Sequence, residues 1–132
     1  MSAPWQAVLA AAWAVAGPPL LVYAATRVRR GQPRLHGGLM ATWVAIELIV
    51  VASFSFLMDP SPRRTELEAL PIFTVHLAFA FATLAGIGWQ LLSRIVPALR
   101  PVHRHTGPYV VLVWCLALIT GIYNFVFLYV SG

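Results

Sequence analysis

Four long apolar segments constrain the fold of this 132-residue chain more than any other feature. Each is close to the roughly 20 residues that an α-helix needs to cross the hydrocarbon core of a bilayer. Backbone polar groups in lipid must be satisfied within the segment, so helices are the expected structure. The segments lie at about residues 4–25, 36–58, 71–92 and 102–130. Joined by short loops, they predict an all-α fold, a four-helix up-down transmembrane bundle.

The composition supports a single integral membrane domain over residues 1–132. Hydrophobic residues make up 60% of the chain and charged residues only 10%, which is too apolar for a soluble protein of this length. The formal net charge is +5. We expect this charge to set membrane topology rather than to bind nucleic acid, because the basic residues lie in the loops beside the apolar segments.

Arginine is concentrated in the first and third of the three loops. These two loops carry Arg27, Arg29, Arg30, Arg34, Arg94, Arg100 and Arg104. The second loop has only Arg63 and Arg64, against Asp59, Glu66 and Glu68. The positive-inside rule therefore predicts that the first and third loops are cytoplasmic and that both termini face outward.

The second apolar segment carries ionisable residues despite its membrane-spanning length. Met40, Trp43 and Glu47 follow His36 at +4, +7 and +11, which places all four within roughly 60° on one helix face. An ionisable group at mid-membrane costs on the order of 2.5–3.5 kcal/mol and usually marks a cofactor, a proton path or a buried pair. We therefore expect this face to contact protein.

The last segment offers a partner for His36. If its helix begins at Pro101, His103 lies on one face with Gly107 and Trp114, and His105 is rotated by about 200°. A helix that begins at Pro108 would instead leave both histidines in a loop. The sequence alone leaves these two starts open.

His36 and His103 both lie where a spanning segment begins on the predicted cytoplasmic side. The second and fourth helices of an up-down bundle are parallel diagonal neighbours, and a diagonal of roughly 14 Å suits a haem between two axial histidines. A bare metal ion, with Met40 as a soft ligand, is one alternative. Another is that the histidines are interfacial and contact headgroups or loops.

Two further residues are candidates for weaker roles. Glu47 has three alternative roles: a buried protonated acid, a proton relay, or a structural hydrogen-bond partner of Asn124 or Thr120; desolvation favours its protonated form. His76 lies toward the opposite membrane face and is either an outer quinol or metal contact or an interfacial hydrogen-bonding residue. No hydrolase, phosphate-loop or CxxC motif is present in the sequence, and we expect no independent catalytic activity.

The histidine-containing segments resemble a known family. The last segment contains His103-Arg104-His105-Thr106-Gly107-Pro108, then Trp114, Ile119-Thr120-Gly121 and Leu128-Tyr129. This pattern resembles the last helix of the small bacterial YozB/CtaM-type membrane family. The second-helix motif of that family is similar to His36-x-x-x-Met40, and His76 falls where the family places another histidine. The resemblance covers Leu35 to Val130 and implies a role in the maturation of haem–copper terminal oxidases.

The sequence departs from that family at Gly37-Gly38, where basic residues are usual, and at Asn124. A weaker similarity is to the transmembrane ascorbate-ferrireductase cytochromes b. Three of their haem-ligand contexts resemble Leu35-His36-x-x-Leu39-Met40, Val75-His76-Leu77 and His103-x-x-x-Gly107. Their fourth histidine would need a fifth helix, so a two-haem path within one protomer is not expected.

These observations lead to one main hypothesis and two alternatives. We expect a bacterial inner-membrane protein that binds haem b through His36 and His103, with Met40, Gly107 and Trp114 beside it. His105 and His76 are secondary candidates for metal ligands. The protein's role would be in terminal oxidase assembly or as a small electron-transfer subunit, with lipid and respiratory-complex subunits as partners; a homo-oligomer is an open alternative. The other hypotheses are a copper-binding assembly chaperone and a structural subunit without a cofactor.

Overall fold

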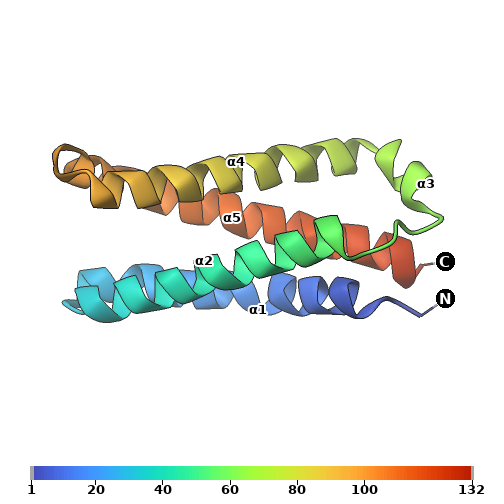
Figure 1. Cartoon of the computed structure of the whole chain (residues 1–132), viewed down its shortest axis with the longest axis horizontal. Coiled ribbons are helices and arrows are strands. Elements are labelled where there is room, and N and C mark those ends of the chain that lie inside the picture. Colours follow the sequence, from blue (N-terminus) through green and yellow to red (C-terminus); the bar gives the residue numbers. More distant parts are fainter. Residues whose placement is uncertain (1, 132) are drawn as a thin grey trace.

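The computed structural model describes residues 2–131 and is built from helices (Figure 1). The long helices are α1 (Trp5–Arg27), α2 (Pro33–Phe56), α4 (Pro71–Ile95) and α5 (Arg100–Tyr129). The short ones are η1 (Val28–Arg30), α3 (Arg64–Glu68) and η2 (Pro97–Leu99). All four long helices are long and apolar enough to cross a membrane. The predicted all-α fold with four spanning helices is confirmed.

Proline residues mark the starts of three long helices. Pro33, Pro71 and Pro101 each lie in the first turn of a helix, where the missing N–H leaves no hydrogen bond unmade. Helix α5 therefore begins before Pro101 and continues through Pro108, which decides between the two starts left open by the sequence. Helix α2 begins three residues earlier than predicted, so that His36 lies in its first turn.

The long helices pack in a row rather than as a closed square. The packed pairs are α2 with α1, α1 with α5, and α5 with α4. Within residues 2–131, α2 and α4 are not a packed pair, although they follow one another in the sequence. Figure 1 shows two antiparallel hairpins, α1–α2 and α4–α5, with both chain ends at the same end of the molecule. The central contact is therefore between the first and last spanning helices.

Small residues allow close contact along the row of helices. A Cβ added at Gly17 of α1 would lie 2.6 Å from Leu118 Cδ1 of α5, and one at Gly86 of α4 would lie 3.0 Å from Val110 of α5. Such small residues let transmembrane helices approach each other when apolar burial gives no net advantage over lipid. The buried core around them is formed by Trp13, Ala14, Leu21, Val50, Ile87, Trp114 and Leu118.

Polar contacts tie the helices together at the end that carries the chain termini. The Gln6 side-chain amide donates to the Leu57 carbonyl at 2.8 Å, which joins the start of α1 to the end of α2. Arg63 donates to the Phe127 carbonyl, and its guanidinium lies 4.5 Å from the centre of the Phe127 ring. A cation at the C-terminus of α5 also complements the helix dipole. The short helix α3 follows Arg63 in the second loop.

The arginine-rich first and third loops lie together at the other end of the molecule (Figure 1). We predict that this end is cytoplasmic, because the seven arginines there outnumber those of the opposite loop. In a Cys115→Ala background, cysteine at exposed Gln32 should resist a membrane-impermeant maleimide in intact cells and react after permeabilisation. Cysteine at exposed Thr65 should react in intact cells. The reverse labelling pattern would contradict the proposed orientation.

Candidate functional site

Glu47 is held at mid-membrane by two indole groups from different helices. Its Oε2 atom accepts a hydrogen bond from Trp13 Nε1 of α1 at 2.6 Å and another from Trp114 Nε1 of α5 at 2.9 Å. The prediction that Asn124 or Thr120 is its partner is wrong. These two residues are rotated about α5 by roughly 80° and 120° from Trp114, so they do not face α2. Glu47 therefore links α2 to both central helices.

A third indole extends this cluster toward the arginine-rich end. The rings of Trp43 and Trp13 lie 5.8 Å apart between centroids, with planes inclined at 40°. Trp43 Nε1 is buried and has no hydrogen-bond partner within the described chain. We call Trp13, Trp43, Glu47 and Trp114 the Glu47 cluster. Apart from Glu47 itself, it contains no ionisable side chain.

His36 lies in the seam between α2 and α1. Its Nδ1 atom is 2.8 Å from the carbonyl oxygen of Ala24, and the side chain is half-buried. Met40, one turn further along α2, is partly buried and packs against the hydrophobic core. The predicted stripe of His36, Met40, Trp43 and Glu47 therefore faces protein along its length.

His103 lies in the equivalent position in the seam between α5 and α4. Its Nδ1 atom is 3.1 Å from the carbonyl oxygen of Gln90 and 3.4 Å from Ser93 Oγ. His105 is exposed. The helix start at Pro101 thus places the two histidines on different faces of α5, with only His103 against protein.

The hydrogen bond of His36 defines which of its ring nitrogens is free. A carbonyl oxygen can only accept, so Nδ1 of His36 carries the proton and Nε2 has the free lone pair in the neutral ring. Histidines that bind metals commonly show this arrangement, in which the other N–H donates to a backbone carbonyl. His103 Nδ1 lies beside the Gln90 carbonyl oxygen and also 2.9 Å from the Gln90 side-chain nitrogen in the amide orientation that its other contacts favour. The contacts of His103 therefore fit either tautomer, one of which leaves Nε2 free.

The Glu47–Trp114 hydrogen bond sets the register between α2 and α5. His36 precedes Glu47 by eleven residues, and His103 precedes Trp114 by the same number. Eleven residues correspond to roughly 16 Å along a helix and to a rotation only about 20° beyond three complete turns. The two histidines thus lie at similar depth, each in the seam of its own hairpin: His36 against Ala24 of α1 and His103 against Gln90 of α4. The helices diverge toward this end (Figure 1).

The glycines beside the histidines leave space around them. A Cβ added at Gly37 or Gly38 would meet no atom within 4 Å. A Cβ at Gly107 would meet only the Gln90 side-chain oxygen, at 3.7 Å. The helix surfaces beside both histidines are therefore free of steric obstruction at these positions.

His76 occupies a separate position nearer the chain termini. Its Nδ1 atom is 3.0 Å from Thr120 Oγ1 of α5, and the ring packs over Gly121. At the same end of the molecule, the Met58 sulfur lies 4.0 Å from the Tyr129 hydroxyl of α5. The described residues contain no group of three or more His, Cys, Asp or Glu side chains that could hold a metal ion. His76 is therefore bound to α5 rather than gathered with other ligands.

The sequence did not reveal that Trp13 and Trp114 are the partners of Glu47. The positions of these tryptophans in the sequence were a usable signal. Tryptophan in membrane proteins is enriched at the membrane–water interfaces, whereas Trp13 and Trp114 lie well inside apolar segments. Indole N–H groups far from the interface need an acceptor. A carboxyl at the same depth supplies one.

Comparison with known proteins does not assign the chain to a family. No family model, curated protein or solved structure matches it. The resemblance to the YozB/CtaM-type family remains a prediction. The function must therefore be argued from the geometry of the site itself.

We predict that the two indole bonds stabilise the bundle. Trp13→Phe and Trp114→Phe should each lower the free energy of unfolding by roughly 1–2 kcal/mol, because each removes a hydrogen bond to a partly buried carboxyl. The measurement is unfolding of the detergent-solubilised protein followed by circular dichroism. Trp5→Phe is the matched control, since Trp5 is 62% exposed. Equal losses in all three variants would show that the indole bonds contribute nothing specific.

Proposed function

We propose that this protein binds one haem b in the membrane, with His36 and His103 as the axial ligands. The observation that carries the proposal is the shared register: both histidines lie eleven residues before residues that are hydrogen-bonded to each other. The free Nε2 atom of His36 and the open glycine surfaces beside both histidines fit the group. Met40, Gly107 and Trp114 would line the same region. Bound haem would supply one-electron transfer at this end of the membrane.

The proposal accounts for the separation of α2 from α5. Helices at contact distance, about 8–10 Å between axes, leave no room for a macrocycle between two ligands. Here α2 packs on α1 and α4 packs on α5, while α2 is joined to α5 through the long side chains of Glu47 and Trp114. The two histidines are therefore presented by different hairpins, as a bridging cofactor requires.

The cellular role is proposed from the sequence resemblance. We infer that the protein acts in terminal oxidase assembly or as a small electron-transfer subunit in the bacterial inner membrane, with a respiratory complex as its partner. A copper-binding assembly chaperone is the second candidate, because the partly buried Met40 thioether lies one helical turn from His36. In that case the His36, Met40 and His103 side chains would supply the ligands.

We predict that His36→Ala and His103→Ala each abolish haem binding, because each removes one axial ligand. His105→Ala should keep the haem, since His105 is exposed on another face of α5. The measurement is the reduced-minus-oxidised absorption spectrum of the purified protein, with haem content per chain. Loss of haem in His105→Ala alone would contradict the proposed ligand set. Stoichiometric copper without a haem b spectrum would favour the second candidate.

We also predict that Glu47→Gln retains the haem. The hydrogen-bond donors to Glu47 within residues 2–131 are the two indoles, and an amide oxygen can still accept from them. The measurement is haem content per chain of the purified variant. Loss of haem in this variant would show that the carboxyl itself is needed to hold the fold.

A further inference from the structure

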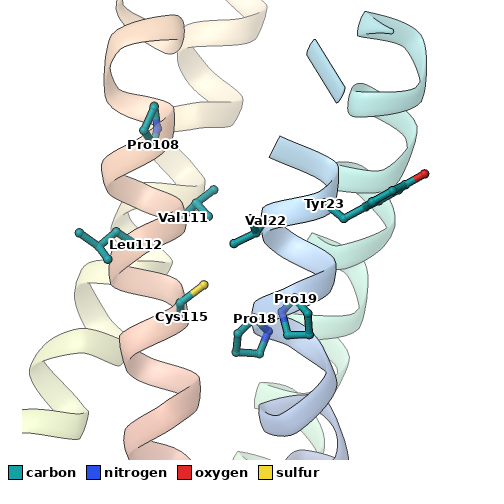
Figure 2. Close-up of a pocket in the computed structure, with 8 residues that line it drawn as sticks. All are labelled: Pro18, Pro19, Val22, Tyr23, Pro108, Val111, Leu112 and Cys115. Carbon is teal, nitrogen blue, oxygen red and sulfur yellow. The ribbon is translucent and has the colours of Figure 1, made fainter. Parts of the chain in front are cut away.

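An apolar pocket lies between α1 and α5, in the half of the bundle nearer the arginine-rich loops (Figure 2). Its volume is about 770 Å³, which is within the range of small-molecule binding sites. It is lined by Pro18, Pro19, Val22, Tyr23, Pro108, Val111, Leu112 and Cys115. Figure 2 shows Val111 and Cys115 of α5 directed toward the α1 side of the pocket.

This pocket is separate from the proposed haem site. Trp114 faces α2 through its bond to Glu47. Pro108 and Cys115 are rotated about α5 by roughly 120° and 100° from Trp114, and no residue of α2 lines the pocket. The α1–α5 pair therefore has two distinct sides, one toward the histidines and one that opens toward lipid.

Positive charge lies at the end of the pocket nearest the loops. Arg104 is exposed and precedes Pro108 by one helical turn on the same face of α5. On α1, the Arg27 guanidinium lies 4.1 Å from the centre of the Tyr23 ring. The Nε atom of Arg27 is buried and has no hydrogen-bond partner among residues 2–131. Two cations and one unused buried donor thus lie one helical turn beyond the lining residues Tyr23 and Pro108.

The depth of the pocket matches one leaflet of a bilayer. Pro108 to Cys115 spans roughly 10 Å along α5, and half of the hydrocarbon core is about 15 Å thick. The apolar lining therefore lies at acyl-chain depth, and the arginines lie where headgroups begin. Basic pockets between transmembrane helices are typical sites for anionic lipid headgroups.

We propose that this pocket binds an anionic diacyl phospholipid, with an acyl chain between α1 and α5 and the phosphate between Arg27 and Arg104. A second copy of this chain in the same orientation fits less well. Its own arginine-rich loops would lie at the same depth, and like charges would repel. A phospholipid brings the opposite charge to that depth and a flexible chain to the apolar lining.

The test is native mass spectrometry of the protein released from bilayer discs of phosphatidylcholine with a minor fraction of phosphatidylglycerol. The wild-type protein should retain phosphatidylglycerol well above its fraction in the disc. Arg27→Gln combined with Arg104→Gln should reduce this enrichment, by roughly fivefold for each arginine removed. The corresponding double lysine variant should keep the enrichment, because it keeps the charge.

Two controls separate a built site from general charge attraction and from misfolding. Arg94→Gln removes an exposed arginine of α4 at the same end of the molecule, outside the pocket lining, and should leave the enrichment unchanged. Val111→Phe should fill the pocket and reduce retention without changing helicity or the haem spectrum. Equal loss in Arg94→Gln and in the Arg27/Arg104 variant would overturn the proposal. The proposal would also be overturned if Val111→Phe dissociated a dimer of the protein and left lipid retention unchanged, because a second copy of the chain would then be the occupant of the pocket.

Discussion

The structure depends most on one carboxyl oxygen, Glu47 Oε2, which accepts hydrogen bonds from two indoles. A carboxyl in the middle of a membrane is costly unless its lone pairs are satisfied. Helix α2 therefore cannot rotate away from α1 and α5 without exposing Glu47 to lipid. Because α2 packs only on α1 among the long helices, the bond from Trp114 is what fixes its position relative to α5. The positions of His36 and His103 follow from that register.

Much of the fold could be predicted from the sequence, because the lengths of the apolar segments are set by the thickness of the bilayer. The phase of the stripe from His36 to Glu47 also follows from helical periodicity. The order in which the helices pack could not be predicted in this way. In lipid both faces of a helix are apolar, so the hydrophobic pattern carries little information about neighbours. In a four-helix up-down bundle α2 and α4 would be expected to pack against each other. They are not a packed pair here.

The partners of individual polar residues were harder to predict than their faces. Periodicity showed that Glu47 faces protein, but Asn124 and Thr120 were chosen as partners by residue type. Thr120 instead contacts His76 on α4. The partner depends on which face of α5 is turned toward α2, and periodicity within α5 does not fix that rotation.

The two ends of the bundle differ in a way that bears on both proposed occupants. At the end with the chain termini, Gln6 and Arg63 join helices through hydrogen bonds to backbone carbonyls. The opposite end has seven arginines. The two ion pairs among residues 2–131, Arg63–Glu66 and Arg64–Glu68, lie at the end with the chain termini, so neither neutralises these arginines. Like charges gathered in this way repel. Haem propionates and a phospholipid phosphate are both acidic groups on apolar bodies. A haem or a phospholipid bound at this end would reduce the repulsion between the arginines and place its apolar part between helices. The excess of arginine that sets topology would therefore also favour acidic amphiphiles as ligands.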